Sequence, residues 1–144
     1  MFGRLGVRFY FWRLIFSLID LSKIGKPIII IFLPQTEDFV EELDIKAKRK
    51  LFFAIRKTKE RIIGQWFTKL KSSEGIYEFR FDESDKFYRL FVFWDTDGAT
   101  DTLIVGTHGI AKKTNQTPKE EIKKAERIRR EYFEEKNRTN KNVQ

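Results

Sequence analysis

Hydrophobic and polar residues follow different periods along the chain, and each period predicts a different element. Residues 26–33, KPIIIIFL, form a continuous apolar run of strand length, which predicts a buried strand. Two helical patterns follow, the first with Thr36 as its N-cap and the second with Asp44 as its N-cap. Residues 64–75 lack a clean period, so we expect a connection there.

Three further strands are predicted at residues 76–81, 87–95 and 101–109. The first, IYEFRF, alternates strictly, whereas FYRLFVFWD is apolar on both sides and is typical of a central strand. Asp97 and Gly98 indicate a hairpin turn, so the last two strands should be antiparallel neighbours.

The last predicted element is a helix with a strong start signal. Thr117 would be its cap, Pro118 its first residue and Glu120 the partner in a capping box. The polar residues after Lys136 are expected to fray.

This order of elements predicts an α+β fold with a small, mainly antiparallel sheet and helices packed chiefly on one face. The other face should then be open and basic, which suits an RNA strand. A chain of 144 residues has the length of one domain. We place that domain at residues 26–136, after an N-terminal helical extension at 1–25 and before a polar tail at 137–144.

The extension is apolar and basic. Its apolar runs are interrupted by Arg8, Arg13, Asp20 and Lys23. None reaches the roughly 20 residues of a spanning helix, so no transmembrane segment is expected. Apolar residues recur at helical spacing at Phe9, Trp12, Ile15, Phe16 and Ile19. This pattern predicts an amphipathic helix that packs on the domain or on a partner; a membrane-surface anchor and a wrongly assigned start codon are the alternatives.

Charge and composition narrow the partners and the chemistry. The 29 Lys and Arg outnumber the 21 Asp and Glu, which gives a net charge of +8 and indicates an anionic partner such as nucleic acid, an acidic protein or a membrane surface. The absence of cysteine excludes disulfides and thiol nucleophiles and fits a reducing cytoplasm. With one histidine, no Walker loop and no dinucleotide glycine pattern, we expect no cofactor and no metal.

Arg80 and Arg89 fall on adjacent predicted strands, and Arg89 stands inside an otherwise aromatic run. Two converging guanidinium groups can hold a phosphate and stabilise the charge that develops when it is attacked. The alternative is that each arginine pairs with a nearby carboxylate such as Glu78 or Asp95.

His108, Lys112 and Lys113 come close together in the chain just before the last helix. An unperturbed histidine has a pKa near neutrality, and crowded cations lower one another's pKa, so either residue type could transfer protons here. The alternative is a structural histidine beside two solvated lysines.

The last helix carries a basic face that would follow a phosphate backbone. The candidate RNA-binding residues are Lys119, Lys123, Lys124, Arg127 and Arg130. Tyr132 either stacks on a base or packs in the core. These residue types suit metal-independent RNA cleavage, because the substrate's own 2′-OH is the nucleophile.

Four ordered blocks resemble the RelE/ParE toxin superfamily and its phage-derived HigB-like branch. They are IYEFR (76–80), YRLFVFWD (88–95), HGIAKKTNQTP (108–118) and EIKKAERIRREY (121–132). The resemblance covers residues 26–136, and one departure from the pattern is Ile110 in place of the usual Phe.

The resemblance implies a RelE-like fold and the cytoplasmic toxin of a type II toxin–antitoxin system. Such a toxin is a ribosome-dependent endoribonuclease of mRNA, held inactive in a hetero-oligomer by a helix-turn-helix antitoxin. The motif positions imply catalytic roles for Arg80, Arg89, His108, Lys112, Lys113 and Tyr132. Since the ParE branch poisons gyrase, the alternative is a non-catalytic module that binds gyrase, RNA or its antitoxin.

Overall fold

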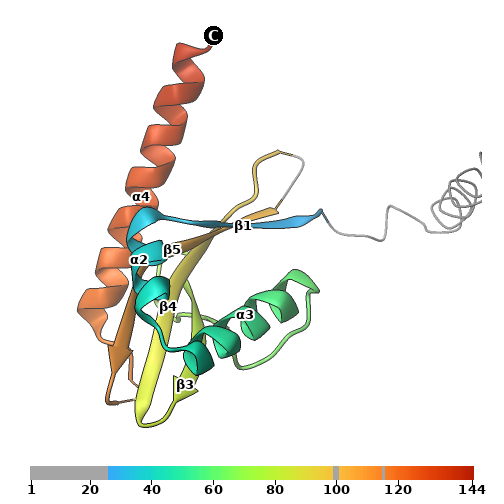
Figure 1. Cartoon of the computed structure of the whole chain (residues 1–144). Helices are drawn as coiled ribbons and strands as arrows, with labels where there is room; N and C mark the ends of the chain where they lie inside the picture. The colour runs from blue at the N-terminus through green and yellow to red at the C-terminus, as the bar shows by residue number, and fades with distance from the viewer. Residues whose placement is uncertain (1–25, 99–100, 115) are drawn as a thin grey trace, which may run out of the picture.

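Five strands form one sheet in the order β1-β5-β4-β3-β2 in the computed structural model, which describes residues 26–98, 101–114 and 116–144 (Figure 1). The elements are β1 (Ile28–Phe32), α2 (Pro34–Glu42), α3 (Ile45–Lys59), β2 (Phe67–Lys69), β3 (Tyr77–Glu83), β4 (Lys86–Asp95), β5 (Asp101–Lys112) and α4 (Lys119–Asn142). The predicted extension at residues 1–25 lies outside the described residues.

The sheet is mainly antiparallel, as predicted. The pairs β2–β3, β3–β4 and β4–β5 are antiparallel, and only the pairing of β1 with β5 is parallel. β4 lies in the middle of the sheet, and Gly98 adopts a positive φ of 93° in the turn toward β5, as expected for the hairpin. β2 was not predicted, because three residues are too few to show an alternating pattern.

β1 is an edge strand, which corrects the prediction of a buried strand. Ile30 and Phe32 pack on the core, whereas Ile29 and Ile31 are 44% and 46% exposed. A continuous apolar run therefore did not mean burial on both faces.

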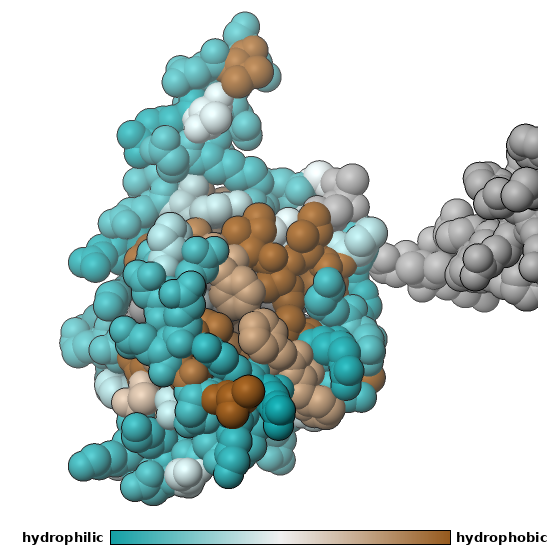
Figure 2. Space-filling view, viewed as in Figure 1, coloured by the Kyte–Doolittle hydropathy of each residue, from teal (hydrophilic) through white to brown (hydrophobic). Residues whose placement is uncertain are grey.

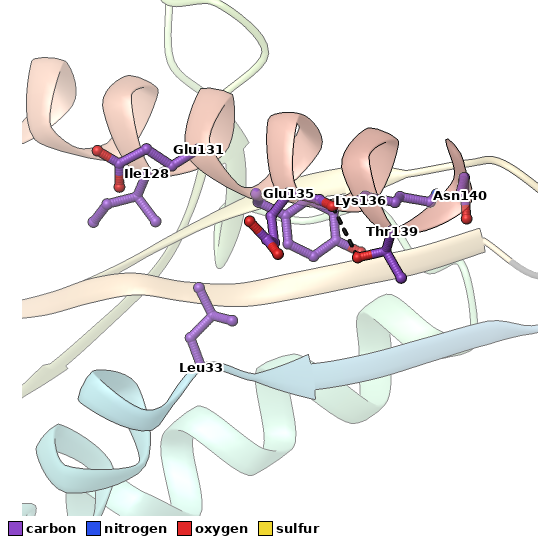
Figure 3. A pocket seen from close by; sticks show the side chains of 8 residues that line it. Leu33, Ile128, Glu131, Glu135, Lys136, Thr139 and Asn140 are labelled. Atoms are coloured by element: carbon purple, nitrogen blue, oxygen red, sulfur yellow. Dashed lines mark hydrogen bonds between the residues drawn. The ribbon is translucent and has the colours of Figure 1, made fainter. Parts of the chain in front are cut away.

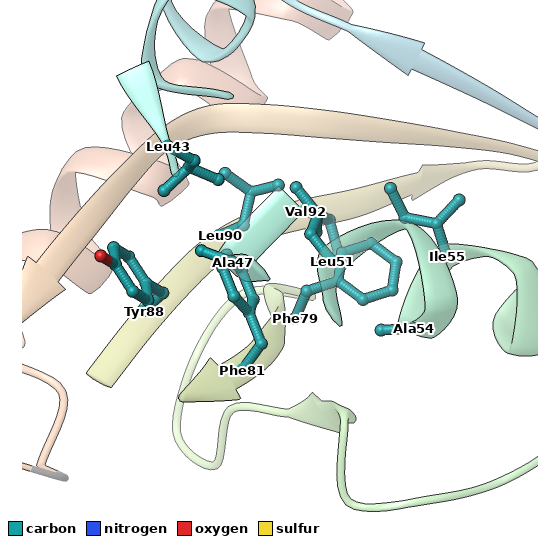
Figure 4. Packing of buried hydrophobic residues seen from close by; sticks show 10 residues of the cluster. All are labelled: Leu43, Ala47, Leu51, Ala54, Ile55, Phe79, Phe81, Tyr88, Leu90 and Val92. Carbon is teal, nitrogen blue, oxygen red and sulfur yellow. The ribbon is translucent and has the colours of Figure 1, made fainter. Parts of the chain in front are cut away.

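β4 separates two apolar clusters. Leu90 and Val92 point toward α3 and lie in the larger cluster, shown in Figure 4 with residues of α3 and β3. Phe91 and Phe93 point the other way and pack with Ala125 of α4.

The helices divide between the two faces. α2 lies on the same face as α3, where the ring of Phe39 meets that of Tyr88 edge to face at 6.5 Å. This confirms that the helices pack chiefly on one face, but the second face is not open, because α4 crosses it. α4 also extends past the sheet (Figure 1), and its projecting part is largely hydrophilic, whereas apolar side chains gather between β1 and α3 (Figure 2).

Two of the three predicted helix caps are wrong. Asp44 does cap α3, accepting a hydrogen bond from the Ala47 amide at 2.8 Å. Thr36, however, lies inside α2 and donates to the carbonyl of Gly106 at 2.6 Å. Thr117 precedes α4 but donates to Glu78 at 3.0 Å, so Pro118 becomes the cap residue without a side-chain bond. Both threonine hydroxyls therefore donate to acceptors that are far away in sequence.

α4 continues to Asn142, so the polar residues after Lys136 are helical where fraying was expected. Ion pairs on the helix surface, such as that of Arg138 with Glu135 at 3.0 Å, accompany this last part.

Gly106 joins α2 to the sheet at an irregular point of β5. Leu90 pairs with Gly109 and Val92 with Val105, so three residues of β5 lie opposite one residue of β4, as in a β-bulge. Gly106 has a φ of 97°, and a Cβ there would lie 1.4 Å from the Thr36 hydroxyl oxygen. Only glycine fits this contact.

We expect Gly106→Ala to lower the free energy of unfolding by about 2–4 kcal/mol, through backbone strain and displacement of α2. Urea denaturation measures this loss. Gly98→Ala is the matched control, because its φ is 93° but its Cβ would meet no described atom within 4 Å. It should cost only the backbone strain of about 1 kcal/mol. Equal losses in the two variants would show that the contact with α2 is unimportant.

Candidate active site

Arg80 and Arg89 lie directly opposite each other on β3 and β4. Like charges at such positions repel, so the pair requires a counter-charge. Glu78 supplies it: its Oε1 lies 3.3 Å from Nε of Arg80 and 3.9 Å from Nε of Arg89. Glu78 is 3% exposed and Arg89 1%, whereas Arg80 is 33% exposed and reaches the surface. The two arginines therefore converge, as in the first prediction, and they also pair with Glu78, as in the alternative.

Arg89 is held by several further contacts. Its Nη1 donates to the carboxylate of Asp82 at 3.1 Å and to the carbonyl of Tyr88 at 2.7 Å. Its guanidinium carbon lies 5.8 Å from the centre of the Phe87 ring. The guanidinium is thus fixed in position by the sheet.

Lys112 extends the group from β5, where it lies opposite Phe87. Its Nζ donates to the hydroxyl of Thr117 at 3.2 Å, and that hydroxyl donates to Oε2 of Glu78 at 3.0 Å. We call Glu78, Arg80, Arg89, Lys112 and Thr117 the Glu78 cluster. Burial and then the charge of Arg89 lower the pKa of Lys112 from 10.5 to about 8, although Glu78 raises it. Lys112 can therefore exchange a proton near neutral pH.

Lys113 follows Lys112 at the exposed start of the loop before α4. The backbone of His108 belongs to the irregular part of β5, but its side chain lies outside the described part of the structure. The proximity of His108 to the cluster remains a prediction.

The structure does not bring Tyr132 to the cluster. Its hydroxyl donates to Asp95 at 2.7 Å, and its ring packs against Phe93 with 5.3 Å between centroids. Asp95 is six residues from Arg89 on β4, which is about 20 Å along an extended strand. Burial and the hydrogen bond to Asp95 raise the pKa of Tyr132 to about 12. These contacts match the alternative in which Tyr132 packs in the core.

The proposed RNA-binding residues of α4 lie on its exposed side, beginning next to the cluster. Lys119 and Lys124 are exposed. The others form surface ion pairs: Lys123 with Glu120 at 3.5 Å, Arg127 with Glu131 at 3.9 Å and Arg130 with Glu74 at 3.2 Å. Such exposed pairs are weak and can yield to a phosphate.

A surface hollow beside the cluster was not predicted. It has a volume of about 450 Å³ and is lined by Arg49, Lys50, Phe53, Ala54, Trp66, Arg80, Phe81 and Asp82. Arg80 therefore belongs both to the cluster and to this hollow. The sequence of α3 could have indicated this hollow, because the helix carries seven Lys or Arg and no Asp or Glu. In the structure α3 also turns Phe53 outward.

A family model described as phage-derived protein Gp49-like (DUF891) matches residues 38–130, which is more than half of the chain. The chain belongs to this Gp49-like family. The match includes the whole Glu78 cluster but neither Tyr132 nor the extension at 1–25. No curated protein and no solved structure matches the chain. Within the described part of this Gp49-like protein, no helix combines the length and the apolar character needed to cross a membrane.

The lowered pKa of Lys112 predicts a pH-dependent stability of the Gp49-like fold. Below pH about 8 folding buries an ammonium group, and between about 8 and 10.5 the unfolded chain binds more protons than the folded one. The contribution of Lys112 to stability must therefore rise with pH through this interval. Measured by chemical denaturation, the free energy of unfolding of the wild type should increase relative to Lys112→Met from pH about 8 to 10.5.

The exposed neighbour provides a control for this experiment. Lys113→Met removes a charge from the next residue in the chain without touching the contact of Lys112 with Thr117. A constant difference between the wild type and Lys112→Met across the interval would contradict the prediction.

Tyr132→Phe tests whether this side chain is structural. Removing the hydroxyl leaves the buried Asp95 carboxylate with fewer donors, so the free energy of unfolding should fall by about 1–2 kcal/mol in urea denaturation. Tyr77→Phe is the matched control, because it keeps the ring stacked on Phe67 at 5.2 Å. A Tyr132→Phe variant as stable as the wild type would show that the bond to Asp95 contributes nothing.

Proposed function

We propose that this Gp49-like protein is the toxin of a toxin–antitoxin pair and that it cleaves mRNA on the ribosome. The observation that carries the proposal is the Glu78 cluster, in which two guanidinium groups share one buried carboxylate and a lysine with a pKa of about 8 is linked to it through the hydroxyl of Thr117. Positive charge that is fixed before the substrate arrives stabilises the transition state of phosphoryl transfer without reorganisation.

In the proposed reaction the 2′-oxygen of the RNA attacks the adjacent phosphorus atom. The new bond joins the 2′-oxygen to phosphorus, the bond from phosphorus to the 5′-oxygen breaks, and the 5′-oxygen takes up a proton. Arg80, which reaches the surface, contacts the phosphate, and Arg89 supplies charge from below. Lys112 exchanges one of the protons, with His108 or Lys113 as its partner.

The hollow beside Arg80 would receive the neighbouring nucleotide. Phe53 and Trp66 offer aromatic surface to a base, and Arg49 and Lys50 offer charge to its phosphate. The basic residues of α4 would guide the strand away from the cluster. A helix-turn-helix antitoxin would inactivate the toxin by covering the Glu78 cluster in a hetero-oligomer. No role in RNA cleavage is assigned to Tyr132, because of its separation from the cluster.

The test is mRNA cleavage by the purified protein in the presence of translating ribosomes, read as new 5′ ends by primer extension. Arg80→Ala and Lys112→Ala should each lower the cleavage rate by about 10²-fold or more. Lys71→Ala, an exposed lysine in the loop between β2 and β3, should cut at the wild-type rate.

Two outcomes would contradict the proposal. If both cluster variants cut as fast as the wild type, the Glu78 cluster is not the active site. If the wild type leaves mRNA intact but inhibits DNA supercoiling by gyrase, the protein is the non-catalytic, gyrase-poisoning alternative. The burial of Arg89, at 1% exposure, favours the non-catalytic alternative, because an arginine buried in an ion pair can stabilise the fold without contacting RNA.

A further inference from the structure

β1 presents a row of apolar side chains on the face opposite α3. Ile30 and Phe32 pack on the α3 side, so the alternation of an extended strand turns Ile29, Ile31 and Leu33 to the other face. Ile29 and Ile31 are 44% and 46% exposed there. A row of this kind on an edge strand is a surface that another segment commonly covers.

The row continues into a groove against α4. Leu33 forms one wall, and Ile128 lies across from it on α4, with Glu131 and Glu135 further along the helix (Figure 3). The groove has a volume of about 450 Å³ and is completed by Tyr132, Lys136, Thr139 and Asn140. It combines an apolar floor with two carboxylates on its rim.

We propose that residues 1–25 of the same chain cover this row and groove as an amphipathic helix. The segment ends immediately before Lys26 and Pro27, which lead directly into β1. So short a connection makes docking intramolecular, with the high effective concentration that a short tether provides.

The dimensions of the two surfaces agree. From Phe9 to Ile19 a helix rises by about 15 Å, at 1.5 Å per residue. From Ile29 to Leu33 the extended chain spans about 13 Å. A helix that runs back along β1 would therefore match the apolar row over its whole length.

The charges also agree. In that direction the N-terminal half of the segment, with Arg4, Arg8 and Arg13, arrives at α4. There it meets the carboxylates of Glu131 and Glu135 on the rim, whose exposed pairs with Arg127 and Arg138 are weak and can be exchanged. The proposal does not depend on the nuclease function, since neither surface includes a residue of the Glu78 cluster.

A fluorescent label on β1 tests the docking in the full-length chain. Because the chain has no cysteine, Ile31→Cys creates a single site for bimane, whose emission tryptophan quenches on contact. We expect quenching by Trp12, seen as brighter emission when Trp12→Phe is added. Trp66 and Trp94 are present in both proteins, so any quenching by them cancels in the comparison. A label at Val143→Cys, 83% exposed near the end of α4, should not respond to Trp12→Phe.

A charge on the row should undock the segment. Adding Ile29→Asp should relieve the quenching of the label at position 31, whereas Ile63→Asp, at a site 97% exposed, should not. Quenching that is independent of protein concentration supports docking within one chain. Quenching that grows with concentration would assign the groove to a second copy and overturn the proposal. Emission that is insensitive to Trp12→Phe would overturn it as well.

Discussion

The buried carboxylate of Glu78 makes the central part of the sheet possible. The register of β3 and β4 sets Arg80 opposite Arg89, and the repulsion of these charges has to be offset inside the protein, where water screens little. Glu78 contacts both arginines with one oxygen and receives the Thr117 hydroxyl with the other. Removing one partner of a buried ion pair costs about 3–5 kcal/mol, so this carboxylate stabilises the register and the loop before α4 at the same time.

The packing of β4 explains why the cluster is rigid. Leu90 and Val92 are buried on one face and Phe91 and Phe93 on the other, so a shift by one residue would move each set into the cluster that the other set fills and disrupt the packing on both faces. Arg89 continues the row of Phe91 and Phe93 and is held at the same depth. The candidate site is therefore built on strands rather than on loops, which is what precise placement of charge requires.

Local patterns predicted what local forces decide. Alternation in two neighbouring strands was sufficient to place Arg80 beside Arg89, and Asp44 capped its helix as its position indicated. The hydrogen-bond partners of the Thr36 and Thr117 hydroxyls could not be predicted, because each hydroxyl can bond either to a nearby backbone amide or to an acceptor far away in sequence. The edge position of β1 and the contact of Glu78 with both arginines could not be predicted either, because both depend on which strands pair in the folded sheet.

The balance of charges around Lys112 bears on its place in the proposed reaction. In the free protein, burial and the arginines outweigh Glu78 and keep the pKa of Lys112 at about 8. A phosphodiester bound at Arg80 adds an anion to the same group, and a nearby anion favours the charged form of a lysine. Substrate binding would then raise the pKa of Lys112 and protonate it. A protonated lysine is suited to donate to the leaving 5′-oxygen, which places the base that receives the 2′-proton elsewhere, on His108 or Lys113.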